Sequence, residues 1–480
     1  MAVLVLLSWI LATPGASPST ARGQGAAFEA LANAMGRADA WHAMYPEFAA
    51  AGAYPGATPR SPSPLMLSVP TSTITPTSAI YLPLIAGSVS ETPTTTLERR
   101  AIWITRYDWT QLDVAPLPVA IDEMVNRVAG AGFNTIYFQV RGAGEAYYTP
   151  GLEPWAARLT SGPVSETLGV DPGWDPLARM VELGHNAGLE VHAYVNVYTA
   201  WLVPPDPSRG DLWPPATTPP QMFDRFTYGP LYEAHPGEYA LGYDWRQHDV
   251  DGVPMPLRSK SCLWASPGLD LVNDYLVDVV SDIVTRYDVD GVHLDLVRYA
   301  GAEYSYDPFS NAAAGDVPTP ERAQWQRDRV TDLVRRLKTA TQAIRPEAEV
   351  SAAVWPYYID LWGKGFKEGY HDYYQDSKGW LASDAVDAIA PMLYGGYSDD
   401  AGWWQVLMLD FVESHGGDRG KVYPGIGAHY NDFTELLWRI EAARGAGAPG
   451  HAIFSYAALN VHDYWDDLAS GPYRLPADPP

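Results

Sequence analysis

The ten residues DGVHLDLVRY, numbered 290–299, decide the fold of this chain. In an extended strand, successive side chains point to opposite faces of a sheet. The aliphatic residues at even positions, from Val292 to Leu296, then share the apolar face that a buried sheet requires. His293 and Asp295 share the opposite face. A buried sheet with an imidazole and a carboxylate on its second face indicates that this face lines a functional site.

Seven further stretches have the same strand-like character, and amphipathic stretches separate them. In order, the eight predicted strands are RAIWITRY (100–107), NTIYFQVRG (134–142), EVHAYVNVY (190–198), GVHLDLVRY (291–299), EVSAAVWP (349–356), DAIAPMLYGG (387–396), KVYPGIGAHY (421–430) and HAIFSYAAL (451–459). Predicted helices include residues 118–132, 175–188 and 274–287. Eight strand–helix units predict an α/β fold, a (β/α)8 TIM barrel. A doubly wound open sheet is the alternative, although no glycine-rich phosphate loop opens the first helix.

Local signals support the helix boundaries. Asp175 precedes Pro176, and Thr319 precedes Pro320, so each pair combines an N-cap with a proline in the first helical position. Gly132 and Gly188 are predicted stop signals at the carboxyl ends of two helices.

Composition divides the chain into four segments. Residues 1–23 resemble a secretory signal peptide, because a short apolar run precedes small residues. The role of residues 24–57 is not assigned. Residues 58–97 are rich in Ser, Thr and Pro and predict a disordered linker. Residues 98–470 form the predicted barrel, whose longest insertion, Trp201–Ala265, follows the third strand and is expected to wall the site. We therefore expect a secreted or cell-envelope protein of bacterial type, with no transmembrane span beyond the signal segment.

The overall composition restricts the class of ligand. The net charge of −25 repels phosphates and argues against nucleic acid. The surplus of aromatic residues, 18 Trp and 30 Tyr, suits sugar binding, because the apolar face of a pyranose lies flat on an aromatic ring. Cys262 is the single cysteine, so an intrachain disulfide and a cysteine-rich metal site are excluded.

Strand alternation gathers polar residues on the inner face of the predicted barrel, where active sites occupy the carboxyl ends of the strands. Such a site suits glycoside hydrolysis, which needs one neutral carboxylic acid and one carboxylate. We expect Asp295 to be the carboxylate, kept ionised by Arg298 or Arg141, and Glu145 to be the acid. His293 is the third candidate catalytic residue. The candidate substrate-binding residues are Arg141, Gln139, His192, Tyr194, Asn196, Arg298, Tyr394, Trp355 and Trp201.

Several motifs in one order resemble the glycosyl hydrolase-like 10 family: RAIWITRYDW, GFNTIYFQVRGAGEAYY, LEPWAARLTSG, WDPLARMVELGHNAGLEVHAYVN and YDVDGVHLDLVRY. The resemblance covers about residues 98–460. It implies a (β/α)8 barrel that acts on cell-envelope glycan, with peptidoglycan as the substrate associated with bacterial members. The family's motif residues fall on Arg141, Glu145, His192, Asn196, His293 and Asp295.

This chain departs from the family pattern at two places. Leu296 stands where the family has a second aspartate. Asn196-Val197-Tyr198-Thr199 stands where the family has Asn-Pro-Tyr-Arg. We expect Arg298 to restore the missing positive charge.

Three functional hypotheses remain open. The leading one is a glycoside hydrolase that needs no metal or other cofactor and acts on a polysaccharide. The second is a catalytically inactive barrel that only binds glycan, which the loss of a carboxylate at Leu296 would permit. The third is a metal-dependent hydrolase that uses His192, His293, Asp295 and His429.

Overall fold

The computed structural model describes residues 96–203, 213–237, 244–258, 261–413 and 421–480. The predicted signal peptide, the segment 24–57 and nearly all of the predicted linker lie outside the described residues. Thr96 and Leu97, the last two residues assigned to the linker, form β1 (Thr96–Leu97), which pairs in parallel with β13 (Ala477–Asp478) near the chain's end. No helix in the described ranges is long and apolar enough to cross a lipid bilayer.

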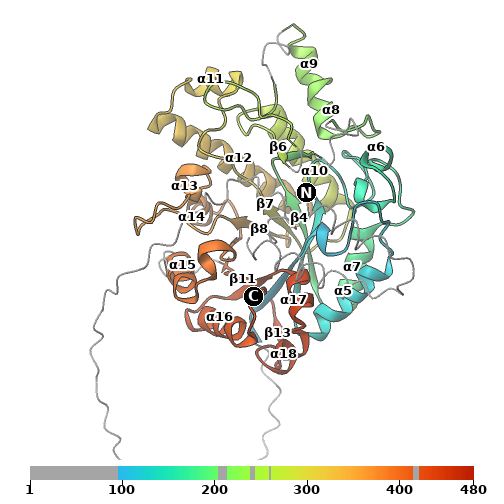
Figure 1. The fold of residues 1–480 in the computed structure, drawn as a ribbon, viewed down its shortest axis with the longest axis vertical. Helices are drawn as coiled ribbons and strands as arrows, with labels where there is room; N and C mark the ends of the chain where they lie inside the picture. Colours follow the sequence, from blue (N-terminus) through green and yellow to red (C-terminus); the bar gives the residue numbers. More distant parts are fainter. Residues whose placement is uncertain (1–95, 204–212, 238–243, 259–260, 414–420) are drawn as a thin grey trace, which may run out of the picture.

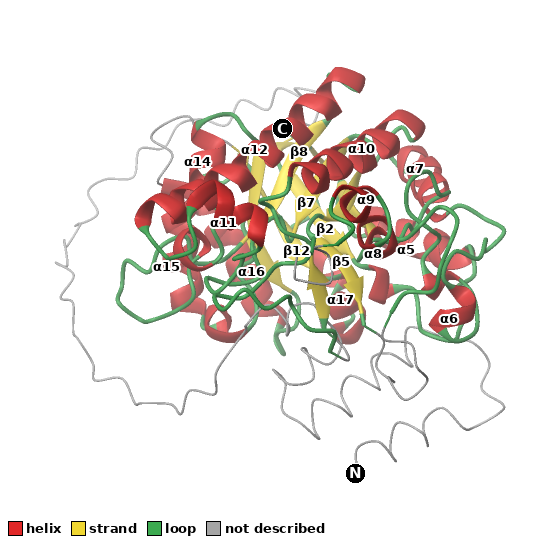
Figure 2. Cartoon of the chain, turned by 90° about the horizontal axis from the view of Figure 1, so that it is seen from above, coloured by secondary structure: helices red, strands yellow, loops and turns green. Residues whose placement is uncertain are grey.

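Nine parallel strands form the main sheet, and helices surround it (Figure 1, Figure 2). In chain order the strands are β2 (Arg99–Ile104), β3 (Thr135–Arg141), β4 (Glu190–Asn196), β7 (Gly291–Asp295), β8 (Glu349–Val354), β9 (Ala388–Pro391), β10 (Lys421–Val422), β11 (Gly425–Gly427) and β12 (Gly450–Phe454). Their order across the sheet is β10-β9-β8-β7-β4-β3-β2-β12-β11. The α/β class and the barrel-like parallel sheet are therefore confirmed.

The two outermost strands of this sheet are neighbours in the chain. Only Tyr423 and Pro424 separate β10 from β11. Tyr423 N donates to Ile389 O of β9 at 2.9 Å, whereas Pro424 O accepts from Ala452 N of β12 at 3.1 Å. Proline has no N–H to donate to a strand ladder, so the predicted seventh strand is split where it changes partner. The sheet thus curls until its edges are joined by one short segment, and all eight predicted strand positions are occupied.

Helices follow the strands and cover the outside of the sheet. They are α5 (Val119–Gly130) after β2, α7 (Pro176–Asn186) after β3, α10 (Asp270–Arg286) after β4, α12 (Pro320–Ile344) after β7, α14 (Ser377–Ala382) after β8, α15 (Ala401–Glu413) after β9 and α16 (Phe433–Gly445) after β11, with α17 (Tyr456–His462) and α18 (Trp465–Ser470) after β12. The predicted amino-terminal boundaries of α7 and α12 are confirmed. The Asp175 side chain accepts from Ala178 N, and the Thr319 side chain accepts from Arg322 N.

Between β4 and α10 the chain forms a separate ribbon. β5 (Thr199–Leu202) pairs in antiparallel with β6 (Cys262–Trp264), and α8 (Met222–Thr227) and α9 (Pro230–Ala234) project at the top of Figure 1. The remaining short elements are α6 (Val164–Thr167), α11 (Pro308–Ala314), α13 (Gly369–Asp372) and the 3-10 turns η1 (Arg106–Asp108), η2 (Ala157–Leu159) and η5 (Gly396–Asp399).

Apolar residues pack on both sides of the sheet. The larger cluster lies between the strands and the helices and includes Ile102, Ile136 and Leu294. The smaller cluster fills the inside of the sheet, with aromatic rings such as Trp103 and Tyr137 opposed by the alanines of β8, β9 and β12. Large residues on some strands face small residues on others, which is how side chains fill a close-packed interior.

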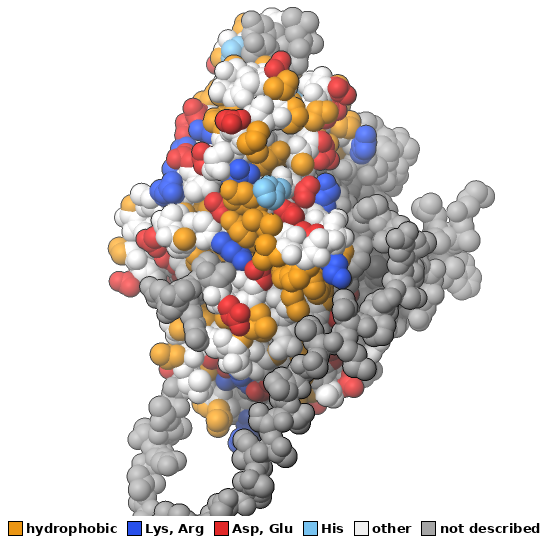
Figure 3. Space-filling view, turned by 90° about the vertical axis from the view of Figure 1, so that its left-hand side faces the viewer, with side chains coloured by type: hydrophobic (Ala, Val, Ile, Leu, Met, Phe, Trp, Pro, Cys, Tyr) orange, Lys and Arg blue, Asp and Glu red, His pale blue; other side chains and the backbone are white. Residues whose placement is uncertain are grey.

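The surface is mixed in character. Figure 3 shows the face on the left-hand side of Figure 1, where α13, α14 and α15 lie, and hydrophobic side chains gather there among charged ones. Leu361, which precedes α13, is 68% exposed. Contiguous exposed apolar groups commonly mark binding surfaces.

Candidate active site

Asp295 is the last residue of β7 and lies at the carboxyl end of that strand, where barrel-like sheets carry their active sites. Its side chain is nearly fully buried. Asp295 Oδ2 accepts a hydrogen bond from the Tyr194 hydroxyl at 2.6 Å, and Oδ1 accepts from the backbone N–H of Leu296 at 2.6 Å. An ionised carboxylate has only acceptors, so these two donors suit a charged Asp295.

Leu296 adopts an unusual backbone conformation beside this carboxylate. Its φ of 49° lies in the left-handed region, which non-glycine residues rarely adopt and which is concentrated at functional sites. In this conformation the Leu296 backbone N–H points toward the Asp295 side chain and donates to it. The Leu296 side chain is buried in the larger apolar cluster, so position 296 adds no carboxylate to the site.

A chain of hydrogen bonds links β4 and β3 beside Asp295. Asn196 is the register partner of Asp295. The Gln139 Nε2 group donates to Asn196 Oδ1 at 3.0 Å. Gln139 Oε1 accepts from both Arg106 N and Arg106 Nη1 at 3.0 Å. The predicted residues Gln139, Tyr194, Asn196 and Asp295 are therefore brought together, and Arg106 extends the group toward Glu145.

Glu145 lies in the loop after β3 and is mostly buried. It accepts weak hydrogen bonds from the Tyr147 hydroxyl at 3.3 Å and from Ala157 N at 3.4 Å. Burial raises the pKa of Glu145 above its usual 4.5, and the positive charges of Arg106 and Arg158 oppose this only in part. A raised pKa favours the protonated form of a carboxyl group, which is the form that donates a proton.

Arg298 is buried in a cage of aromatic rings. Its guanidinium carbon lies 4.4 Å from the ring centroid of Tyr373, 5.0 Å from that of Trp264 and 5.3 Å from that of Trp355. Nη1 donates to Tyr299 O at 3.0 Å, whereas Nε and Nη2 find no hydrogen-bond partner in the described part of the chain. Burial lowers the pKa of Arg298, and the charge of nearby Asp295 opposes this effect. Arg298 is thus close enough to Asp295 to interact electrostatically.

His293 lies two residues before Asp295 on β7, farther from the carboxyl end of the strand, and is fully buried. The Trp103 indole N–H donates to His293 Nε2 at 2.9 Å, so Nδ1 carries the proton and donates to Ser351 Oγ at 2.8 Å. The Tyr137 ring stacks on the imidazole at a centroid distance of 3.9 Å. Burial lowers the pKa of His293 well below 6.5, helped by the charges of His192 and Arg99. The imidazole is therefore neutral and enclosed.

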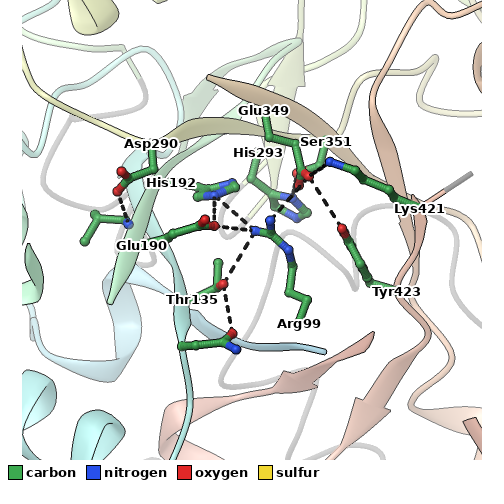
Figure 4. Close-up of polar contacts among 12 residues, drawn as sticks. Arg99, Thr135, Glu190, His192, Asp290, His293, Glu349, Ser351, Lys421 and Tyr423 are labelled. Atoms are coloured by element: carbon green, nitrogen blue, oxygen red, sulfur yellow. Dashed lines mark hydrogen bonds and ion pairs between the residues drawn. The ribbon is translucent and has the colours of Figure 1, made fainter. Parts of the chain in front are cut away.

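His192 lies at the opposite end of the strands, in a buried network that Figure 4 shows. The network joins the amino-terminal ends of β2, β4, β8 and β10. Arg99 Nη1 lies 3.2 Å from His192 Nε2 and 2.9 Å from a Glu190 oxygen. Glu349 binds Arg99 Nη2 at 3.3 Å and Lys421 Nζ at 2.9 Å. His192 faces the interior as predicted, but it lies at the amino-terminal end, away from Asp295.

Arg141 does not face the interior, and this expectation was wrong. The register of β3 against β4 shifts between Gln139 and Arg141, so Arg141 pairs with Val195. Such a bulge turns the next side chain to the other face of the sheet. There Arg141 is fully buried, forms a two-pronged ion pair with Glu153, and donates to the carbonyls of Asn196, Val197 and Thr199.

The three candidate aromatic residues have different positions. Trp201 is only 3% exposed and belongs to the larger apolar cluster. Tyr394 stacks on Phe454 at 4.5 Å inside the sheet. Trp355 follows β8 and is half-buried, and its indole N–H donates to Lys367 O at 2.7 Å. Of the three, Trp355 has the greatest access to solvent.

The four residues of the metal hypothesis are not brought together. His192 lies in the amino-terminal network, whereas His429 follows β11 and contacts Asp399 at 2.7 Å. Within the residues that the structure describes, no group of three His, Cys, Asp or Glu side chains is placed to hold a metal ion.

Two residues of the site were not singled out from the sequence, although both belong to the first predicted strand. Trp103 faces the interior and donates a hydrogen bond to His293, and Arg106, which lies just beyond the end of β2, donates to Gln139. The same alternation that identified His293 identifies Trp103 as inward-facing, because Arg99, Ala101 and Trp103 share one face.

The family comparison extends over most of the described chain. Residues 98–205 and 233–430 match the family model described as Glycosyl hydrolase-like 10. The match includes every candidate residue from Gln139 to Tyr394.

Similar proteins carry related names. Glycosyl hydrolase YngK of Bacillus subtilis (strain 168) is 27% identical over 352 residues, which are 69% of this chain and 60% of YngK, so this chain corresponds to only part of that protein. Glycosyl hydrolase DigH of Escherichia coli (strain K12) is 25% identical over 370 residues, covering 70% of this chain and 75% of DigH. The glycoside hydrolase domain of PgaB (BpsB) from Bordetella bronchiseptica has the same fold, with a TM-score of 0.54 at 15% identity over 77% of this chain and 98% of that domain.

Proposed function

The chain belongs to the glycosyl hydrolase-like 10 family, and we propose that it is a glycoside hydrolase that cleaves a polysaccharide by carboxylate acid/base chemistry. The observation that carries this proposal is the contrast between Asp295 and Glu145. Asp295 accepts two strong hydrogen bonds, whereas burial raises the pKa of Glu145. Glycoside hydrolysis requires one carboxyl group of each kind.

In this mechanism Glu145 donates its proton to the glycosidic oxygen as the bond to the anomeric carbon breaks. Asp295, as the anion, attacks the anomeric carbon or removes a proton from the attacking water. Tyr194 and the Leu296 N–H orient the Asp295 carboxylate. The positive charges of Arg106 and Arg158 favour the ionised form of Glu145, so they stabilise the carboxylate that remains after proton transfer.

The remaining candidates divide into two groups by their position on the strands. We propose that Gln139, Asn196, Arg298, Tyr394 and Trp355, which lie near the carboxyl ends of the strands, contact or position the substrate. We propose structural roles for His293 and Trp201, which are buried, for His192 at the amino-terminal end and for Arg141 on the outer face of the sheet.

We propose a cell-envelope or other extracellular polysaccharide as the substrate class, with the glycan strands of peptidoglycan as the first to test. The family membership and the curated relatives named glycosyl hydrolases support this choice. The predicted signal peptide supports a secreted or cell-envelope location, where such glycans are found.

A glycan-binding barrel without turnover is the second candidate. Leu296 favours it, because the second aspartate of the family pattern is replaced here by a buried leucine. Binding of glycan without hydrolysis would identify this function.

The deciding experiment measures reducing ends released from purified peptidoglycan, both intact and stripped of peptides, and from a panel of plain polysaccharides. The wild type is compared with Asp295→Asn and with Asp316→Asn, a control on an exposed loop. Release that is lost only in Asp295→Asn supports the hydrolase. Firm pull-down of glycan without release by the wild type supports the binding-only barrel. Proton NMR of the first product then separates attack by Asp295, which retains the anomeric configuration, from activation of water, which inverts it.

A further inference from the structure

The loop between β8 and α13 exposes apolar side chains on the face shown in Figure 3. Leu361 is 68% exposed. Trp362 and Phe366 from this loop are partly exposed, as is Trp403 at the start of α15. We call Trp362, Phe366 and Trp403, with Tyr357 beside them, the aromatic platform.

The rings of the aromatic platform are fixed relative to one another. The Trp403 indole N–H donates to the Tyr357 hydroxyl at 2.7 Å. The ring centroids of Trp362 and Trp403 are 5.0 Å apart in an edge-to-face arrangement, and those of Tyr357 and Phe366 are 4.7 Å apart. The platform is thus assembled before any ligand arrives, which reduces the entropy cost of binding.

The loop that carries Trp362 is itself held in shape by one carboxylate. Asp360 accepts hydrogen bonds from Trp362 N at 3.3 Å and from Gly365 N at 2.6 Å, and Asp360 N donates to Glu368 at 2.8 Å. Burial raises the pKa of Asp360, but the backbone donors outweigh it and the pKa is lowered. A loop with this internal support presents the partly exposed Trp362 side chain in a defined position.

The aromatic platform is continuous with the candidate active site. The indole N–H of Trp355 donates to Lys367 O, so the loop is attached directly to the residue that follows β8. Trp355 in turn covers the guanidinium of Arg298, which interacts with Asp295. A chain of contacts through Trp355 and Arg298 therefore links the platform loop to Asp295.

We propose that the aromatic platform is a second sugar-binding site, which binds units of the same polysaccharide beyond those at Asp295. The substrate class rests on the proposed function. The apolar face of a pyranose suits an exposed indole ring. Lys364 Nζ lies 5.5 Å from the Trp403 ring centroid and supplies a donor for a sugar hydroxyl or carboxylate. A few polar groups beside fixed rings are typical of sites for small polar ligands.

The test compares the full-length wild type with Trp362→Ala and Trp362→Phe. Trp438→Ala is the matched control, because Trp438 is 39% exposed on α16 and lies outside the platform. The probes are long peptide-free glycan strands from peptidoglycan, short oligosaccharides cut from them, and the same panel of plain polysaccharides. Pull-down is measured in the Asp295→Asn background, and KM and kcat are measured in the active background.

We expect Trp362→Ala to weaken binding of long strands about tenfold, the scale of one good aromatic contact, and to raise KM with kcat unchanged. Trp362→Phe should lie between wild type and Trp362→Ala. The effect should shrink as the oligosaccharide shortens, and Trp438→Ala should bind as the wild type does.

The platform would be overturned by equal binding of Trp362→Ala and Trp438→Ala, or by no binding of any polymer by the wild type. Loss of a dimer in sedimentation of Trp362→Ala, with glycan binding unchanged, would instead assign the surface to self-association. Binding through Trp362 without any release of reducing ends would contradict the hydrolase and leave the platform standing. Hydrolysis that Trp362→Ala leaves unchanged at every chain length would contradict the platform and leave the hydrolase standing.

Discussion

Asp295 and Glu145 are chemically similar side chains in different surroundings. Asp295 lies at a strand end, where a hydroxyl and a backbone N–H donate to it. Glu145 lies in a loop, where its hydrogen bonds are long and burial raises its pKa. The two environments separate an anion from an acid.

We expect Glu145→Gln to reduce hydrolysis at least a hundredfold, because glutamine cannot donate the proton. In the wild type, the alkaline decline of the rate should lie above pH 4.5, since the pKa of Glu145 is raised. A rate–pH profile for wild type and Glu145→Gln checks both expectations. Glu166→Gln, in exposed α6 nearby, serves as the control. An unchanged profile in Glu145→Gln would remove Glu145 from the acid role.

His293 should contribute stability rather than a proton. We expect His293→Phe to lower the free energy of unfolding by about 2–4 kcal/mol, because the Trp103 and Ser351 partners lose their hydrogen bonds. The folded state lowers the pKa of His293, so its contribution is complete above pH 6.5 and declines as the pH falls below that value. Urea unfolding at pH 8 and pH 5.5 measures this. A pH-independent difference between wild type and variant would contradict it.

Sequence alternation predicted which face a side chain occupies but not its depth along the strand. Tyr194, His293 and Asp295 face the interior as expected. His192 also faces the interior. It lies two positions before Tyr194, nearer the start of the strand, and so it is close to the charged side chains of Arg99 and Glu190. The prediction that Arg141 faces the interior was wrong for another reason. A β-bulge shifts the register of β3 at this point, and the alternation pattern of the sequence does not indicate it.

At the scale of elements, the ends of β3 and β4 are held together by one buried ion pair. Arg141 and Glu153 are both fully buried, and Tyr275 of α10 donates to Glu153 at 3.1 Å. The Arg141 donors also hold the carbonyls between β4 and β5. The loop that carries Glu145 is therefore fixed against the neighbouring strand.

Removing one partner of the Arg141–Glu153 ion pair should destabilise the folded protein. We expect Glu153→Ala to lower the free energy of unfolding by about 3–5 kcal/mol, because it leaves the Arg141 charge buried and unpaired. The double variant Arg141→Met with Glu153→Met should recover part of the loss. Asp332→Ala, which removes a surface pair with Arg336 on α12, should cost less than about 1 kcal/mol. Urea unfolding compares the three, and equal losses in Glu153→Ala and Asp332→Ala would contradict the assignment.

The order and type of the elements could be predicted because apolar periodicity and capping residues are local signals. Asp175 and Thr319 cap α7 and α12 as expected. The break between β10 and β11 was less visible, although Pro424 marks it in the sequence. Its consequence, a change of partner from β9 to β12, depends on the closure of the whole sheet.

At the scale of the molecule, a cluster of charges joins the two ends of the folded chain. Glu98 binds Arg444 at 2.7 Å and Arg100 at 2.8 Å, and His451 lies 3.7 Å from it. Burial raises the pKa of Glu98, but these groups outweigh it and lower the pKa to about 2. Burial lowers the pKa of His451 to about 4, although Glu98 opposes this.

Both groups predict a loss of stability in acid. The contribution of His451 is complete above pH 6.5 and is lost as the pH falls to 4, which amounts to about 3 kcal/mol. The contribution of Glu98 is complete above pH 4.5 and is lost toward pH 2. Thermal unfolding between pH 7 and pH 4 should show a flatter profile in His451→Phe than in the wild type. His371→Gln, on the exposed surface of α13, should leave the profile unchanged.

The pairing of β2 with β12 also has a consequence for how the chain folds. Arg100 bonds to Tyr473 O across 373 residues, and Arg99 bonds to Glu349 across 250. Contacts this distant form slowly, because a long loop must close before they contribute any stability. While the ribosome is still making the last strands, β2 lacks its partner and presents an open edge. Nascent chains of this protein should therefore depend on chaperones until residues 450–473 emerge.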